Sequence, residues 1–299
     1  MDSFRIRHLF MEEAMLNIRR TARLACCMAI VLGTVAMAGQ QRGTPAGGER
    51  GDLDEIRKVS TLIGTNVMDR ANTKVADVRD LVLSPEGDAL YIVLGHGGVG
   101  GVGETYTAAP FDALKVRHAD GKWAVDIDRT AEDLKRAPTI QSENYRELTD
   151  PQWVDRAHQF FCPADAPKDR PVEWVLLASK IRSAKLKTPR NEDLGKMEDL
   201  LLDRMHRVAF AIVGRGGVLG VGEHYIPVPW SKLSLTINQE TAAITASLDA
   251  TKAQLDKAPL IKGDNYATLL APGFADEVRR YFEPIGRGTT TGGAETGRR

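Results

Sequence analysis

Short alternating runs of apolar and polar residues fill the central part of each half of the chain. Two apolar runs, 75–83 and 89–94, flank a polar turn that contains proline and glycine, which predicts a β-hairpin. A second hairpin is predicted where 115–117 and 123–127 flank a polar turn that ends in Gly121-Lys122. Several short strands with turns every eight to twelve residues favour a small barrel or a tightly curled sheet.

Helical patterning comes only late in each half. Short helices are predicted to begin at Thr130 and Thr251, the second with a full capping box, and to stop at a proline after about two turns. Two further helices are predicted over 151–161 and 272–282, each with a proline in its first turn. The expected class is therefore mainly β with short helices (α+β).

The whole pattern occurs twice. The phrase at 97–104 returns at 216–223 with an offset of 119, and after a two-residue insertion the offset becomes 121. Each unit is one ordinary small domain in size. We predict two tandem small β-barrels, each followed by short C-terminal helices, at 59–162 and 173–284, joined by a proline-rich linker at 163–172.

The segments outside these units have a different character. Arg19, Arg20 and Arg23 precede an apolar run of about fifteen residues that ends at Ala38, which is typical of a secretory signal over 1–38 and too short to span a bilayer comfortably. An uncleaved anchor is the alternative, and translation could begin at Met15. Disordered segments are expected at 39–58 and 285–299.

Charge and cysteine content limit the possible partners and crosslinks of the part that follows residue 38. Removing residues 1–38 removes five basic and three acidic residues, which leaves 35 basic against 37 acidic. This balance argues against binding to a phosphate backbone. The remaining part keeps Cys162 alone, so no internal disulfide is expected there.

The motifs of each unit fall in a recognisable order. The run D-L-V-L-S-P-E-G is followed by a strand ending in V-L-G, by G-G-x-x-G-x-G-E, by a strand ending in Pro-Phe or Pro-Trp, and by A-P. This order resembles the PRC-barrel, the β-barrel module of the photosynthetic reaction centre H subunit, also found in a ribosome-maturation factor. The resemblance covers about 60–145 and 179–266, although 181–186 lacks the Leu-Ile-Gly opening seen at 62–64. It implies a binding or assembly module and brings no catalytic residues.

The glycine phrase also satisfies G-x-G-x-x-G at 98–103, so a dinucleotide site must be considered. Such a site needs a helix to open there, whereas this chain continues with an extended pattern, and Leu219 replaces the second glycine in the other copy. We predict a structural turn and no cofactor. The turn residues are Gly98, Gly103, Glu104, Gly217, Gly222 and Glu223.

Two pairs of carboxylates repeat between the units, Glu104 with Glu223 and Asp80 with Asp199. Paired carboxylates can serve acid–base chemistry or hold a cation. The plainer expectation is that each accepts hydrogen bonds from turn N–H groups or pairs with a nearby basic side chain.

The candidate interaction residues are those that differ between copies. His96 corresponds to Arg215, and His224 to Thr105. His96 and Arg215 flank the same glycine turn and could form an exposed polar rim, but ordinary solvated surface is the plainer expectation. The histidine and cysteine spacings match no zinc motif. Cys162 aligns with Glu283, which indicates an exposed thiol able to pair between molecules. An inert half-buried cysteine is the equal alternative.

Together these observations predict an exported, non-enzymatic binding, scaffolding or assembly module in the periplasm or outside the cell, with a protein partner in the envelope. Membrane association is expected only through an uncleaved signal or a partner. The alternative is a small-ligand binder or enzyme that uses the groove between the units near Glu104, Glu223, His96 and Arg215. Nucleic-acid binding conflicts with both export and neutral charge.

Overall fold

Both repeats lie within one compact unit, Glu49–Arg299, of the computed structural model. The structure describes residues 53–98, 103–141, 145–162, 173–215, 224–238, 241, 243–286, 288 and 290–293. The predicted signal at 1–38 and the predicted linker at 163–172 lie outside the described residues.

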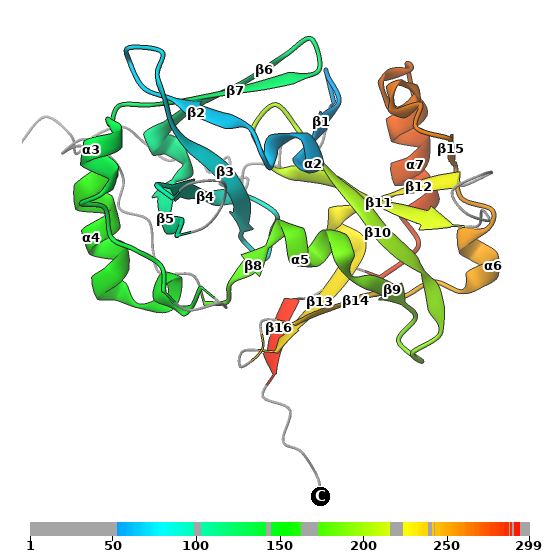
Figure 1. Cartoon of the computed structure of the whole chain (residues 1–299). Helices are drawn as coiled ribbons and strands as arrows, with labels where there is room; N and C mark the ends of the chain where they lie inside the picture. The colour runs from blue at the N-terminus through cyan, green and yellow to red at the C-terminus, as the bar shows by residue number, and fades with distance from the viewer. Residues whose placement is uncertain are drawn as a thin grey trace, which may run out of the picture. The chain divides into compact units, whose positions relative to one another are not determined.

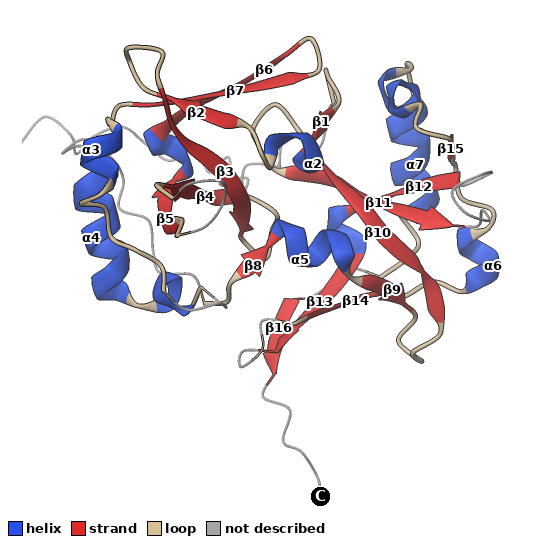
Figure 2. Cartoon of the chain, in the orientation of Figure 1, coloured by secondary structure: helices blue, strands red, loops and turns tan. Residues whose placement is uncertain are grey.

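The first repeat forms a sheet with the strand order β5, β4, β3, β2, β7, β6 (Figures 1 and 2). Neighbours are antiparallel except for β2 and β7, which run parallel. The two hairpins predicted from the sequence are present as β3–β4 and β6–β7. The strand bounds are β2 (Asn66–Met68), β3 (Lys74–Leu83), β4 (Ala89–His96), β5 (Thr105–Pro110), β6 (Leu114–Ala119) and β7 (Lys122–Ile127).

The second repeat forms the corresponding sheet in the order β15, β12, β11, β10, β9, β14, β13, β16. Its β9 and β14 are parallel, as β2 and β7 are in the first repeat. Its bounds are β9 (Lys185–Lys187), β10 (Asp193–Leu202), β11 (Val208–Arg215), β12 (His224–Pro229), β13 (Leu233–Asn238), β14 (Ile244–Leu248), β15 (Ile261–Lys262) and β16 (Thr290–Gly293).

Short helices follow each sheet, as predicted. Two more, which are not predicted, precede β2 and β9, where one or two turns are too short to give a helical period in the sequence. Thr130 and Thr251 each form a capping box, because each side chain accepts from the backbone N–H of the third helical residue and each backbone N–H donates to that residue's side chain. The helices are α2 (Val59–Leu62), α3 (Ala131–Leu134), α4 (Pro151–Phe161), α5 (Ala178–Ser183), α6 (Lys252–Leu255) and α7 (Phe274–Phe282), with 3₁₀ turns η1 (Phe111–Ala113), η2 (Arg146–Thr149), η3 (Trp230–Lys232) and η4 (Tyr266–Leu270).

The two repeats exchange short strands. β1 (Arg57–Lys58), which precedes α2 of the first repeat, pairs with β10 of the second, with Arg57 opposite Leu202. β8 (Leu176–Leu177), which precedes α5 of the second repeat, pairs with β3 of the first, with Leu176 opposite Leu83. These contacts are related by the repeat offset, so each repeat contributes a strand to the sheet of the other.

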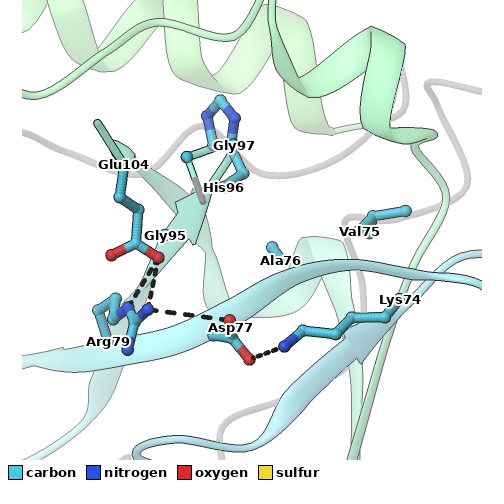
Figure 3. A pocket seen from close by; sticks show the side chains of 10 residues that line it. Lys74, Val75, Ala76, Asp77, Arg79, Gly95, His96, Gly97 and Glu104 are labelled. Carbon is cyan, nitrogen blue, oxygen red and sulfur yellow. Dashed lines mark hydrogen bonds and ion pairs between the residues drawn. The ribbon is translucent and has the colours of Figure 1, made fainter. Parts of the chain in front are cut away.

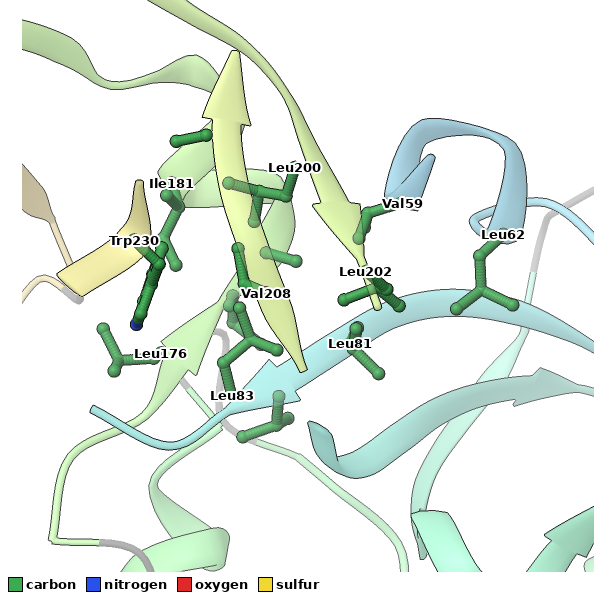
Figure 4. Packing of buried hydrophobic residues seen from close by; sticks show 14 of the residues in the cluster. Val59, Leu62, Leu81, Leu83, Leu176, Ile181, Leu200, Leu202, Val208 and Trp230 are labelled. Carbon is green, nitrogen blue, oxygen red and sulfur yellow. The ribbon is translucent and has the colours of Figure 1, made fainter. Parts of the chain in front are cut away.

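This exchange explains why the ends of β3 and β10 are apolar at consecutive positions. Leu81, Val82 and Leu83 are all fully buried, although successive residues of a strand point to opposite faces. One face packs in the repeat's own core and the other against the partner repeat. Figure 4 shows Leu81 and Leu83 beside Leu202 and Val208, so the core is continuous across the joint.

The structure confirms mainly β structure with short helices but shows no barrel closure. Among the described residues, each sheet remains open, because the end strands of each order are not paired with one another. The segment that precedes each repeat's first helix joins the other repeat's sheet instead.

Both predicted disordered borders differ in the structure. Leu53 and Ile56 pack against the core and β1 is paired, so structure begins within 39–58. In the predicted tail at 285–299, Ile285 is buried and β16 runs parallel to β13. Composition alone misses these segments because their order comes from backbone hydrogen bonds offered by a strand on another part of the chain.

Candidate functional site

The repeated carboxylates Asp80 and Asp199 lie at the joint between the repeats. Both side chains are buried, with 4% of each residue exposed. Asp80 accepts from Ser179 of the other repeat, through the hydroxyl and through the backbone N–H at 3.1 Å. Asp199 accepts from Ser60 in the same way, with the N–H at 3.0 Å. The two contacts are therefore equivalent across the joint.

Each of these carboxylates also accepts from the next residue of its own strand. The N–H of Leu81 lies 2.8 Å from Asp80 Oδ1, and the N–H of Leu200 lies 2.9 Å from Asp199 Oδ1. Burial raises the pKa of Asp80, and the bonds from Ser179 and from the two backbone N–H groups oppose that rise. These hydrogen bonds satisfy the buried carboxylate oxygens, and those from the serines also hold the two repeats together.

The hairpin turns of the two repeats meet beside these contacts. The N–H of Val208 donates to Gly87 O at 2.9 Å, and the N–H of Ala89 donates to His206 O at 3.3 Å. Trp230 packs on Gly87, where an added Cβ would lie 2.8 Å from the indole. At the equivalent place the ring of Phe111 lies 4.8 Å from that of His206. One glycine and one histidine thus occupy matching positions, both with positive φ.

His206 is affected by this position. Burial lowers its pKa, and the Arg57 guanidinium adds to the effect, while Asp203 and Asp112 oppose it. The neutral imidazole is therefore the form that fits between Phe111 and the turn.

A cavity of about 410 Å³ opens at one end of β3 and β4 in the first repeat (Figure 3). A row of ion pairs crosses it, from Lys74 to Asp77 at 2.7 Å, then to Arg79 at 3.8 Å, then to Glu104 at 2.5 Å. The cavity is lined by Lys74, Val75, Ala76, Asp77, Arg79, Gly95, His96, Gly97, Gly98 and Glu104.

Gly95 makes the last of these ion pairs possible. A Cβ at Gly95 would lie 2.4 Å from a Glu104 oxygen and 2.7 Å from Arg79 Nε. Only glycine leaves this space, so the pair lies flat across β4. The Glu104 carboxylate raises the pKa of the Arg79 guanidinium, and 8% of the Glu104 side chain is exposed.

His96 is the polar group in this cavity whose hydrogen bonding is incomplete. It is 6% exposed, and its Nε2 has no hydrogen-bond partner among the described residues. Burial lowers its pKa, although the nearby Glu104 opposes this effect. The expected exposed rim is therefore incorrect for this residue.

Arg215, at the equivalent place in the second repeat, pairs with Asp256 at 2.7 Å, and 16% of its side chain is exposed. The position of Asp256 is held by Lys135 in the first repeat, so that ion pair has no counterpart there. His224 is exposed on β12, opposite Arg215 and Lys262. Arg215 and His224 thus face each other on paired strands of the second repeat, whereas His96 lies in the first.

The glycine turn is only partly described. Gly98 and Gly103 both have positive φ, which agrees with a turn that requires glycine. Gly217, Gly222 and Glu223 lie outside the described residues. Cys162 is half-buried at the end of α4, and it is the sole cysteine in the described part of the chain.

Sequence reasoning missed the serines of the joint. Ser60 and Ser179 are related by the offset of 119, as are Asp80 and Asp199. The offset matches serine with serine and aspartate with aspartate. It does not indicate that each serine contacts the aspartate of the other repeat.

Two further properties of the described residues concern metal binding and membrane insertion. They contain no cluster of three or more histidine, cysteine, aspartate or glutamate side chains suited to a metal ion. Among the helices of the same residues, none has the length and apolar character needed to cross a bilayer.

Comparison with known proteins identifies the first repeat. No curated protein matches the chain. Residues 54–134 match the family model of the PRC-barrel domain, a range that runs from the segment before β1 through α3. The predicted family resemblance is thereby confirmed over residues 54–134 of the first repeat, which match a PRC-barrel domain.

Proposed function

We propose that this protein is an exported, non-enzymatic scaffolding module of the cell envelope that binds a protein partner through its two PRC-barrel-like repeats. The family match at 54–134 is compatible with a binding module. The export part of the proposal is supported by the basic and apolar pattern of residues 1–38.

The observation that carries the proposal is the use made of the repeated carboxylates. Asp80 and Asp199 are the pair that most resembles an acid–base set, yet each is buried and accepts three hydrogen bonds across and along the joint. A group held in this way stabilises the assembly of the two repeats. It is not placed to meet a substrate.

The test is crosslinking in intact cells followed by fractionation and identification of the crosslinked proteins. We expect the protein in the envelope fraction, shortened after Ala38, and crosslinked to a reproducible partner. A cytosolic, unprocessed protein would contradict export. Recovery of no partner above background, together with turnover on a substrate panel, would contradict the scaffolding role.

A second candidate function is supported by the cavity beside His96. Its volume of about 410 Å³ suits a small polar ligand, for which the Nε2 of His96, unpartnered among the described residues, is a hydrogen-bonding group. Lys74 and Arg79 also line the cavity, but Asp77 and Glu104 already pair with them. This cavity differs from the groove between the repeats expected from the sequence, because all of its lining residues belong to the first repeat.

This candidate is tested by titration with small carboxylates and inorganic phosphate while the backbone amide signals of residues 95–97, which the His96→Gln variant retains, are followed by NMR. Saturable shifts that disappear in His96→Gln, with an unchanged unfolding midpoint, would support ligand binding. The matched control is His224→Gln, since His224 is exposed and lies in the other repeat. Signals that do not respond at any concentration would exclude it for these ligands.

A further inference from the structure

The two repeats differ at one equivalent sheet edge, which is paired with a further strand in the second repeat and, among the described residues, not in the first. In the second repeat β13 pairs with β14 on one side and with the C-terminal strand β16 on the other. In the first repeat the equivalent strand, β6, pairs with β7 alone among the described residues and ends the strand order. Figure 1 shows β6 and β7 as a ribbon at the margin of the molecule's first sheet.

Side-chain burial records the same difference at one of the two equivalent positions. Leu235 and Ile237 of β13 are 1% and 2% exposed where β16 runs beside them. Val116, which corresponds to Leu235, is only half-buried on β6, whereas the side chain of His118, which corresponds to Ile237, is covered by Glu55 and Trp123. An edge strand with unpaired backbone groups is a template on which an extended chain can add.

The register of β16 indicates how such a chain would lie. Thr290, Thr291 and Gly292 stand opposite Leu235, Thr236 and Ile237 in parallel orientation. The residues of β6 at those three places are Val116, Arg117 and His118. Because strand side chains alternate, an added strand needs small residues opposite Val116 and His118 and presents the residue between them to solvent, beside Arg117.

The charges on β6 favour one kind of added strand over another. Lys115 and Arg117 are exposed on β6 itself, whereas the acidic Asp126 lies one strand back and is paired with Arg117. Pairing of β6 with the β6 of a second copy would bring two sets of these basic residues together, and like charges across strands are unfavourable. A strand with a carboxylate at the solvent-facing position fits better.

We propose that the outer edge of β6 is a docking site for an extended segment of a partner protein, added as a parallel strand, with small residues facing Val116 and His118 and a carboxylate beside Arg117. The inference rests on the proposed binding function and names the class of partner segment that it would recognise.

The probe is an eight-residue peptide copied from 286–293 with glutamate in place of Thr291, compared with the same peptide carrying lysine there. Binding to the full chain is measured by hydrogen exchange of backbone amides. We expect the glutamate peptide to slow exchange over 114–119 and to leave exchange over 233–238 unchanged. The lysine peptide should bind about two- to fivefold more weakly, the range for an exposed ion pair.

Two variants serve as matched controls. Arg117→Glu, at a side chain that is 65% exposed, should reverse the preference between the peptides. Thr236→Glu, at the equivalent place on the covered edge, should leave both affinities unchanged. A chain that ends at Ile285 uncovers β13 and should gain a second peptide site over 233–238.

Three results would overturn the proposal. One is the absence of peptide-dependent protection over 114–119, whether or not the shortened chain binds. Another is protection, before peptide is added, of the β6 amides that do not bond to β7, since the edge would then be covered by the chain itself or by a second copy. The third is a crosslinked envelope partner whose capture is unaffected by Arg117→Glu, which would leave the proposed function intact and remove this site.

Discussion

At the residue scale, the joint between the repeats depends on single positions that differ between the copies. Gly87 and His206 occupy equivalent places with positive φ, and each lies under an aromatic side chain of the other repeat. The copies have thus diverged where they touch: Trp230 covers a glycine, and the smaller Phe111 covers an imidazole.

Gly87→Ala should therefore lower the free energy of unfolding by more than its backbone strain alone would. Gly64 offers a matched control, because it has the same φ of 93° and nothing within 4 Å of an added Cβ. We expect Gly64→Ala to lower the free energy of unfolding by about 1–2 kcal/mol from the left-handed backbone. Gly87→Ala should cost at least about 1 kcal/mol more, because its Cβ meets Trp230. Equal losses in urea unfolding would show that the Trp230 contact is unimportant.

Buried His96 and half-buried His206 should make the protein sensitive to acid. His96 and His206 both have pKa values lowered by burial, so the folded state prefers their neutral forms. Their contribution to stability is fully present above the ordinary histidine pKa of about 6.5 and is lost as pH falls through the lowered values.

The corresponding measurement is the thermal midpoint between pH 7.5 and 5. His206→Asn keeps a residue that tolerates positive φ and removes the titration, so the fall in midpoint with acid should become smaller. His224→Asn, at an exposed site, is the control and should retain the wild-type slope. A slope that is identical in all three proteins would contradict the assignment.

At the scale of elements, α2 and α5 position the hydroxyls that hold the joint. Ser60 and Ser179 lie in the first turns of these short helices, where each side chain and backbone N–H reach the same carboxylate. Each helix directly follows an exchanged strand, β1 or β8, so strand and serine act together as one clasp.

Ser60→Ala and Ser179→Ala should each reduce the free energy of unfolding by about 2 kcal/mol, the usual range for a bond to a charged group whose partner stays buried. Ser231→Ala, at an exposed position in η3, should change it by less than about 0.5 kcal/mol. Chemical denaturation of the three variants measures this. Losses for the first two no larger than for Ser231→Ala would contradict the clasp.

The sequence predicts those elements whose signal is local. The hairpins β3–β4 and β6–β7 follow from apolar runs around polar turns, and α3 and α6 from their threonine caps. Helix α4 begins at its predicted proline, whereas α7 begins at Phe274, two residues later than predicted, after Gly273 with φ of 80°.

The missed elements depend on distant partners. β1, β8 and β16 are two to four residues long and exist because another strand offers an edge, which no periodicity in so short a segment reveals. Dependence on distant partners also explains why the site was only partly predicted. The repeated aspartates could be found by their offset, but their serine partners belong to the opposite repeat.

At the scale of the whole molecule, the exchanged strands imply that the two repeats do not unfold separately. A continuous core includes buried residues of both, and each sheet loses a strand if the other repeat unfolds. A duplicated module joined in this way behaves as one cooperative unit, despite a linker that the sequence would assign to two independent domains.

The most direct test follows hydrogen exchange of β4 in the first repeat and β11 in the second through a urea transition of the intact chain. We expect both strands to lose protection at one midpoint, and Ser179→Ala to move the two midpoints together by the same amount. Two separate midpoints, with the substitution moving only one of them, would show that the repeats are independent domains and that the exchanged strands do not couple them.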